Sequence, residues 1–286
     1  METRAHAVLD AAYKNGVRYF DAARSYGRAE EFLGSWLRSR EISPASIVIG
    51  SKWGYTYTAD WKIQAEAHEI KEHSLDVLRK QWSESTSTLG EHLNLYQIHS
   101  ATLASAVLEN EQVLGQLAAM KNDGLAIGLS VSGPNQRAVI ERAIATEIEG
   151  VPLFDSIQAT WNLLETSAES SLAMAREAGM GVIIKEALAN GRLTDRNSSP
   201  GFAEKMALLH SEAARLSTSI DALALAAVLA QPWVDIVLSG AAREEHLLSN
   251  LSALDVLWDA TAEDNLGLLT ESTEEYWRRR SRLKWN

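Results

Sequence analysis

The chain has 286 residues, enough for one large domain or two small ones, and its hydrophobic fraction of 46% and charged fraction of 23% are those of an ordinary globular protein. The net charge of −11 argues against a nucleic-acid partner, and no apolar run approaches the roughly 20 residues of a membrane span, so we expect no membrane partner. The absence of cysteine excludes disulfides, thiol nucleophiles and thiolate metal sites.

The first 16 residues, METRAHAVLDAAYKNG, predict an amphipathic helix without the apolar core of a signal peptide. Secretion is therefore not expected. Together with the lack of cysteine, which suits a reducing compartment, this predicts a cytoplasmic protein.

Short apolar strands then alternate with amphipathic helices along most of the chain. The predicted strands are residues 17–21, 46–52, 93–99, 125–131, 156–160, 181–185 and 235–239. This rhythm predicts an α/β protein with right-handed βα units and a parallel sheet. Seven strands are one short of a closed (β/α)₈ barrel, and the missing one would precede residue 1. We therefore expect a TIM-type barrel that lacks its first strand or is truncated there.

No linker, repeat or change in composition divides the chain, which predicts one barrel domain over 1–286 with a C-terminal tail, 257–286. The segment Trp53–His73 is expected to begin as a loop over the barrel mouth and to end in a helix. Asn190–Phe202 is a second long, turn-rich loop. Such loops are where substrate choice tends to reside. Residues 273–286 are expected to form a docking helix.

Ionisable side chains follow the first three predicted strands. Asp21 ends the first, Lys52 ends the second and His99 ends the third, while Tyr26 lies on the loop after Asp21. Each has an ordinary structural explanation when taken alone: a strand-end turn, a lysine reaching solvent, a satisfied core histidine. In a parallel barrel, however, these strand ends converge on one face. The four groups together therefore predict an acid–base site.

The combination suits carbonyl reduction. A phenol has an ordinary pKa of about 10, and a neighbouring ammonium stabilises the phenolate while a carboxylate keeps that ammonium charged. A neutral imidazole can align a substrate oxygen. Because none of the four side chains can supply a hydride, a nicotinamide cofactor is implied.

These stretches resemble the aldo-keto reductase family. FDAARSYG is similar to its strand-two signature, GSKWG to its lysine strand and LYQIHS to its histidine strand. The resemblance implies a (β/α)₈ barrel that reduces an aldehyde, ketone or sugar carbonyl, or oxidises the alcohol, with NADP(H). It implies Tyr26 as general acid/base, Asp21 and Lys52 as the groups that tune its pKa, and His99 as the group that orients the carbonyl.

The cofactor side resembles the family in three further stretches. IGLSVSG implies that Ser130 binds the nicotinamide carboxamide, and SIQATWN gives Gln158 the same role, with Asn162 near the substrate pocket. LSGAAREEHLLSN resembles the phosphate- and adenine-binding segment, where a glycine turn runs into a helix N-terminus. The matching positions are Ser239, Gly240, Ala241, Arg243, His246 and Asn250. Arg243 would clamp a 2′-phosphate, so we expect NADP(H) rather than NAD(H).

Lys185 departs from the family, since it stands where many members stack an aromatic ring on the nicotinamide. It would lie near the cofactor and disfavour the oxidised ring unless Glu186 or the substrate compensates. An anionic substrate group and a strand-end ion pair are the alternatives. Trp53 is predicted to line the substrate pocket.

Two other functions are compatible with parts of the sequence. A catalytically weak relative that binds nucleotide and regulates a partner would fit the missing first strand. A metal-dependent hydrolase would need clustered ligands, and His68 and His73 are poorly spaced for one, so no metal is expected. The expected partner is a small carbonyl or alcohol substrate; its identity and the oligomeric state do not follow from the sequence.

Overall fold

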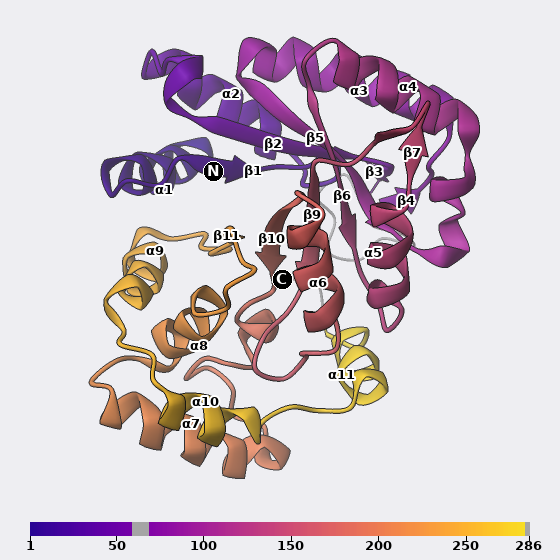
Figure 1. The fold of residues 1–286 in the computed structure, drawn as a ribbon. Coiled ribbons are helices and arrows are strands. Elements are labelled where there is room, and N and C mark those ends of the chain that lie inside the picture. The colour runs from indigo at the N-terminus through magenta and orange to yellow at the C-terminus, as the bar shows by residue number, and fades with distance from the viewer. Residues whose placement is uncertain (59–68, 284–286) are drawn as a thin grey trace. The chain divides into compact units, whose positions relative to one another are not determined.

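The computed structural model describes residues 1–58 and 69–283. The chain forms two compact units, one of Met1–Ser132 with Ala138–Ile157 and one of Gly133–Arg137 with Gln158–Asn286. Figure 1 labels the helices and strands of both where there is room. We describe each unit by itself, and the single domain expected over 1–286 stays a prediction.

The first unit alternates strands and helices. Its main elements are α1 (Glu2–Lys14), β1 (Tyr19–Asp21), α2 (Ala29–Ser39), β2 (Val48–Trp53), α3 (Leu75–Leu89), β5 (Leu93–Ala101), α4 (Glu111–Asn122), β6 (Ala126–Val131) and most of α5 (Gln136–Ile144). The strands pair in the order β1-β2-β5-β6, and each pair is parallel. In this register Asp21 lies opposite Gly50, and Lys52 lies opposite Gln97. Asp21, Lys52 and His99 therefore stand on the successive strands β1, β2 and β5, and Tyr26 lies on the loop that follows β1.

Two small antiparallel hairpins join this unit, β3 (Tyr55–Tyr57) with β4 (Glu69–Lys71) and β7 (Glu147–Ile148) with β8 (Val151–Pro152). The prediction that the 53–73 segment ends in a helix was wrong. Residues 69–71 pair with 55–57, and α3 begins only at Leu75 because the Ser74 side chain caps it by accepting from the Val77 amide. His68 lies outside the described residues.

The second unit repeats the alternation. Its elements are β9 (Ser156–Thr160), whose first two residues belong to the first unit, α6 (Glu169–Glu177), β10 (Gly181–Lys185), α7 (Ala203–Arg215), α8 (Ile220–Leu229), β11 (Ile236–Val237), α9 (Glu244–Leu251), α10 (Ala260–Gly267) and α11 (Thr273–Arg280). The strand order is β9-β10-β11. All seven predicted strands are present, which confirms the α/β class.

Short 3-10 turns fill several connections. They are η1 (Pro44–Ser46), η2 (Gly90–His92), η3 (Leu103–Ser105), η4 (Val107–Glu109), η5 (Ala189–Gly191), η6 (Pro200–Phe202) and η7 (Ser252–Asp255). The loop predicted over 190–202 thus carries only η6 and part of η5.

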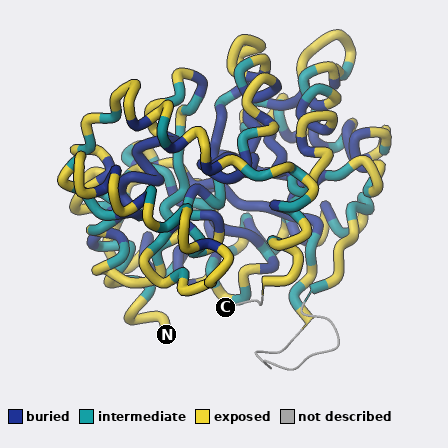
Figure 2. The backbone as a smooth tube through the Cα atoms, turned by 90° about the horizontal axis from the view of Figure 1, so that it is seen from below, coloured by how far each residue is buried: buried dark blue, intermediate teal, exposed yellow. Residues whose placement is uncertain are grey.

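Burial follows the apolar pattern of the sequence. All five residues of β9 are buried, and the dark blue segments of Figure 2 mark such stretches along the chain. Helix α8 is apolar apart from Asp221 in its first turn, and most of its residues are buried. It contributes to a core cluster of the second unit that includes Leu209, Leu266 and Tyr276. In the described part of the chain, no helix is long and apolar enough to cross a bilayer.

The C-terminal helix α11 docks on the second unit, as expected. Tyr276 is buried, and its hydroxyl accepts a hydrogen bond of 3.0 Å from the Asn162 side-chain amide. Arg280 donates to the Glu186 carboxylate at 2.8 Å. These contacts hold the helix beside the residue that follows β10.

Candidate active site

Asp21 lies at the end of β1, on the same face of the strand as Tyr19 because side chains alternate along a strand. Its Oδ1 accepts hydrogen bonds from the Tyr19 hydroxyl at 3.0 Å and from the Gln97 side-chain amide at 3.1 Å. The carboxylate is therefore fixed from two neighbouring positions before any cation is considered.

Lys52, on β2, supplies that cation. Its ammonium forms an ion pair with Asp21 and donates to the Ala22 carbonyl at 2.7 Å. The side chain is fully buried. Burial alone would lower the lysine pKa, but the charge of Asp21, with Tyr26 acting in the same direction, outweighs burial and raises that pKa. The structure thus favours the charged ammonium while keeping it out of water.

Tyr26 and His99 complete the group. The Lys52 ammonium nitrogen lies 4.9 Å from the centre of the Tyr26 ring, and the Tyr26 hydroxyl lies 3.5 Å from Nε2 of His99. Nδ1 of His99 lies 3.4 Å from the Ser25 hydroxyl. Tyr26 is 44% exposed, so a solute can reach the phenol while the ammonium behind it stays buried. The structure brings all four predicted residues together within the first unit.

A buried ion pair anchors the loop that carries Tyr26. Arg24 pairs with Glu30, which begins the buried face of α2, and also with Glu84 of α3 at 2.8 Å. The other Glu30 oxygen accepts hydrogen bonds from Ser51 at 2.5 Å and Ser85 at 2.7 Å. The loop between Asp21 and Tyr26 is therefore tied to two helices and to β2.

The sequence reasoning missed these supporting residues. Tyr19 and Gln97 stand two positions before Asp21 and His99, so the period of two along each strand places them on the same face. That signal could have found them. The pairing of Arg24 with Glu30 has no comparable signal, because an acidic residue in a first helical turn usually faces solvent.

Ser130 lies buried on β6, and its hydroxyl oxygen accepts a hydrogen bond of 2.8 Å from the Ser100 amide. The hydroxyl proton stays available for donation. This geometry suits a side chain that faces the carboxamide of a nicotinamide, and that role stays a prediction.

In the second unit, Gln158 is buried on β9 and Lys185 ends β10. The Lys185 ammonium donates to the Thr160 hydroxyl at 3.0 Å and lies 3.9 Å from the Glu186 carboxylate. Burial would raise the Glu186 pKa, but the charges of Lys185 and Arg280 outweigh burial and lower it. The strand-end ion pair weighed from the sequence is thus present, while the role of Lys185 toward a cofactor stays a prediction.

The two predicted pocket residues are both buried. Asn162 donates to the Glu186 carbonyl at 2.9 Å and to Tyr276, and its oxygen accepts from the Leu164 amide at 3.0 Å. Its amide hydrogens are therefore used in holding the second unit together. Trp53 is fully buried in the first unit. Contact of either side chain with a substrate stays a prediction.

The segment that runs from Ser239 into α9 is the predicted phosphate-binding segment, and this role stays a prediction. The Asn250 side chain donates to the carbonyl and hydroxyl oxygens of Ser239 at 3.1 and 2.8 Å, which fixes the turn. Gly240 has a φ of +63° and open space where a Cβ would stand. Helix α9 begins at Glu244 without a side-chain cap, so its first amide groups can bind a phosphate.

Charges around this turn are mixed. Arg243 is exposed and lies 3.4 Å from the Glu245 carboxylate, with Glu244 beside it. His246 and Ala241 are half-buried. The Arg243–Glu245 ion pair is exposed and therefore weak, and binding of a phosphate by Arg243 stays a prediction.

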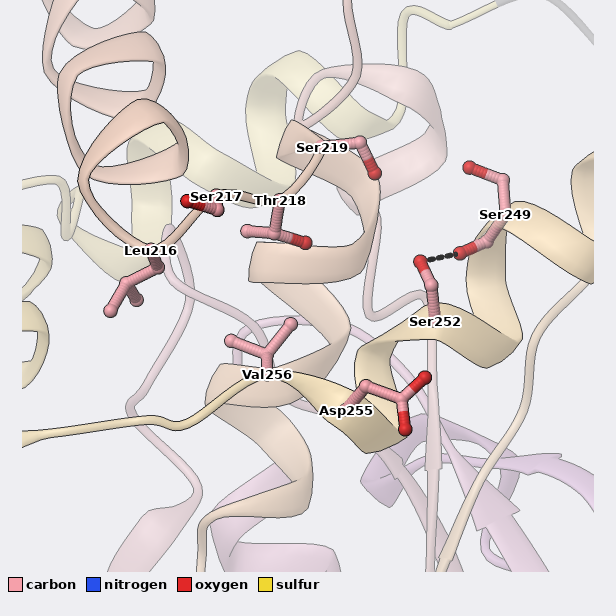
Figure 3. A pocket seen from close by; sticks show the side chains of 8 residues that line it. All are labelled: Leu216, Ser217, Thr218, Ser219, Ser249, Ser252, Asp255 and Val256. Atoms are coloured by element: carbon pink, nitrogen blue, oxygen red, sulfur yellow. Dashed lines mark hydrogen bonds between the residues drawn. The ribbon is translucent and has the colours of Figure 1, made fainter.

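A separate cavity in the second unit lies between the start of α8 and the end of α9 (Figure 3). Its lining is mostly hydroxyl side chains, and the residues are Leu216, Ser217, Thr218, Ser219, Ser249, Ser252, Asp255 and Val256. None of the predicted site residues lines it. Among the described residues no group of three or more histidine or acidic side chains could hold a metal ion.

Comparison with known proteins identifies the family to which this chain belongs. The model of the aldo/keto reductase family matches residues 1–264. The chain belongs to this family. An uncharacterized oxidoreductase of Bacillus subtilis is 24% identical over 271 residues, which cover 88% of this chain and 82% of the relative. A Schizosaccharomyces pombe protein whose name places it among the aryl-alcohol dehydrogenases is 29% identical over 210 residues, 68% of this chain and 59% of that protein.

A solved aldo-keto reductase of Bacillus halodurans, in its holo form, shares the fold. The TM-score is 0.76 at 21% identity, over 95% of this chain and 89% of that one. The expected TIM-type aldo-keto reductase fold is thereby confirmed. The chain is an oxidoreductase of a family that uses nicotinamide cofactors.

Proposed function

We propose that this aldo-keto reductase reduces an aldehyde, ketone or sugar carbonyl, or oxidises the alcohol, with NADP(H), and that Tyr26 is its general acid/base. The observation that carries the proposal is the buried Asp21–Lys52 pair beside the exposed phenol of Tyr26. A carbonyl reductase needs one proton donor that substrate can reach and a charge behind it that water cannot screen.

Tyr26 is the donor in this scheme. Reduction places negative charge on the carbonyl oxygen, and the Tyr26 hydroxyl gives that oxygen its proton. The phenolate left behind is stabilised by the ammonium of Lys52, which Asp21 holds in place. In the oxidative direction the phenolate takes the alcohol proton back.

His99 orients the substrate. Its Nε2 lies 3.5 Å from the Tyr26 hydroxyl, so a carbonyl oxygen in front of the pair can lie within hydrogen-bonding distance of both. Edge-on contact with the Tyr55 ring, 4.9 Å between ring centres, limits rotation of the imidazole. A bound nicotinamide would supply the hydride, and the protein residues supply the proton and the alignment.

The cofactor would be held at both ends. We assign Ser130, Gln158 and Lys185 to the nicotinamide end, and the turn of Ser239, Gly240 and Ala241 with Arg243, His246 and Asn250 to the phosphate and adenine end. The uncapped start of α9 and the guanidinium of Arg243 favour a 2′-phosphate, which is the basis for NADP(H) over NAD(H). The name of the yeast relative makes aromatic aldehydes the first substrate class to test.

The decisive experiment replaces Tyr26 by Phe. Turnover of NADPH with an aromatic aldehyde such as 4-nitrobenzaldehyde should fall by about a thousandfold, within the range lost with a general acid. The Kd for NADPH, followed by the fluorescence of the nine tryptophans, should stay within about twofold.

Tyr13→Phe is the matched control, because the Tyr13 hydroxyl bonds only weakly to Ser46, at 3.3 Å, away from the site. It should keep full activity. Equal losses of turnover and NADPH affinity in Tyr26→Phe would contradict the assigned role and indicate a structural one.

A further inference from the structure

The backbone turns sharply just after His99. Ser100 has a φ of +53°, the left-handed region that serine rarely adopts, at a cost on the order of 1 kcal/mol. The pairing of β5 with β6 is interrupted at this point, between Ile98 and Ala101. An irregularity of this kind re-aims the side chain next to it, here the imidazole of His99.

Three side chains hold this turn. Ser130 accepts from the Ser100 amide at 2.8 Å, and Lys71, at the end of β4, donates to the Ser100 carbonyl at 2.7 Å. Nε2 of His73 lies 2.9 Å from the His99 carbonyl oxygen. The residue that carries the imidazole is thus fixed through its own peptide group by His73.

His73 also fits tightly against the end of β2. Its ring packs edge-on against the Trp53 indole at 5.5 Å between centres. A Cβ on Gly54 would lie 2.2 Å from the His73 ring, so only glycine allows this approach. The ring therefore fills the space beside the two residues that follow Lys52, while its nitrogen holds His99.

We infer that His73 is a positioning residue: it links the end of β2, which carries Lys52, to the end of β5, which carries His99, and so sets the imidazole against Tyr26 and Lys52. The inference rests on the proposed function for its catalytic meaning, but the placement of His99 can be measured without turnover.

The hydrogen-bond chemistry defines the state of the ring. A carbonyl oxygen only accepts, so Nε2 of His73 carries the proton. Nδ1 is then an acceptor, and it is buried without a partner among the described residues. Burial lowers the His73 pKa to about 4, so the neutral ring and its single donor persist through the neutral pH range.

The test compares His73→Phe with His73→Gln. Phenylalanine keeps the ring that packs on Trp53 and Gly54 but removes the donor, whereas the glutamine amide nitrogen can take the place of Nε2. His92→Phe is the matched control, because His92 makes the same kind of bond, 2.8 Å from the Ile42 carbonyl oxygen, just before the opposite end of β5. It stands seven residues from His99, about 23 Å along the strand.

In His73→Phe, kcat for the aromatic aldehyde should fall about tenfold to a hundredfold with an unchanged Kd for NADPH. His73→Gln should return to within about threefold of the original chain, and His92→Phe should match it. The imidazole NMR signals of His99, assigned with a His99→Gln variant, should shift and change their titration in His73→Phe and not in His92→Phe.

The outcomes separate the two proposals. If no carbonyl is reduced by any variant but the His99 signals shift only in His73→Phe, the proposed function fails and the positioning role stands. If His99 signals and kcat in His73→Phe equal those in His92→Phe, the positioning role is overturned, whatever the enzyme does.

Discussion

Tyr19 lies against Gly50 across the β1–β2 pair, and this contact leaves no room for a side chain. A Cβ at Gly50 would stand 2.5 Å from the Tyr19 hydroxyl oxygen and 3.3 Å from Oδ1 of Asp21. The Tyr19 hydroxyl can therefore reach the Asp21 carboxylate only because residue 50 is a glycine and leaves room for it.

Gly50→Ala should displace the Tyr19 hydroxyl, lower kcat and destabilise the chain by about 1–3 kcal/mol in urea unfolding, as for other overpacked sites. Gly115→Ala is the control. Gly115 lies in α4 with nothing within 4 Å of its Cβ position, so alanine should stabilise the helix by about 0.5–1 kcal/mol. An unchanged stability and kcat in Gly50→Ala would contradict the tight contact.

The low pKa of His73 has a consequence for acid stability. The folded pKa of about 4 lies below the ordinary value of about 6.5, so the unfolded chain takes up the proton first as pH falls. The contribution of the neutral His73 ring to the free energy of unfolding is therefore fully present above about pH 6.5 and is lost as pH falls toward 4.

The test is to measure the free energy of unfolding of the original chain and of His73→Phe at pH 7, 5.5 and 4. The two values should approach each other as the pH falls. The difference between the two chains should change by about 3 kcal/mol between pH 7 and pH 4, because the contributions of the carboxylates that both chains share cancel. A difference that stays constant with pH would mean that the ring is not kept neutral in the folded state.

At the scale of single residues, the sequence predicted that Asp21, Tyr26, Lys52 and His99 lie together, but not the residues that support them. Asp21, Lys52 and His99 each end an apolar run, which a linear pattern can show. The contacts of Glu30 with Ser51 and Ser85 join positions 21 and 55 residues apart, and no local pattern encodes them.

Among the elements, the loop from Asp21 to Tyr26 owes its place to one buried ion pair. Glu30 is nearly fully buried, with 3% of its side chain exposed, and it contacts Arg24, Ser51 and Ser85. Removing the Glu30 charge would leave Arg24 with only the more exposed Glu84 carboxylate as a counter-charge, and would weaken the hydrogen bonds from Ser51 and Ser85. Loss of this contact should therefore loosen both the loop from Asp21 to Tyr26 and its packing against α2, which carries Glu30.

Glu30→Gln should cost about 3 kcal/mol of unfolding free energy and lower kcat, because the loop that carries Tyr26 loosens. The neighbouring Glu31→Gln is the control. Glu31 pairs with Arg28 at 2.6 Å, but both side chains are more than half exposed, so the expected loss is below about 0.5 kcal/mol. Similar losses for the two variants would refute the anchoring role.

Helices and strands were predicted correctly where a contiguous stretch of the sequence carries the pattern that defines them. Every strand of the parallel sheets was found from its apolar run, and caps such as Ser74 mark helix starts. The β3–β4 hairpin was missed because its partners, Tyr55 and Lys71, stand 16 positions apart and each strand has only three residues. Runs this short carry almost no periodicity.

Across the whole molecule, the predicted chemistry and the predicted phosphate recognition fall in different compact units. The four predicted acid–base residues belong to the first unit, while the turn from Ser239 to Asn250 belongs to the second. The two functions should therefore be separable by substitution. Nothing in the composition marks this division, because no linker or change in charge accompanies it.

Arg243→Ala should raise the Kd for NADPH about tenfold or more, as for loss of a charge-assisted contact to phosphate, and leave the Kd for NADH within about twofold. Saturating kcat should not change, because the acid–base residues are untouched. Equal weakening of both cofactors would contradict recognition of a 2′-phosphate by Arg243.

The burial of Lys52 also governs its chemical reactivity. Acylating reagents react with an amine that is neutral and exposed to solvent. Lys52 meets neither condition, because its side chain is buried and the charge of Asp21 favours the protonated ammonium, which has no free lone pair. Exposed lysines such as Lys14 and Lys80 have no such protection. The rate at which Lys52 is labelled should therefore report the rate at which the strand ends of the first unit open and expose it to solvent.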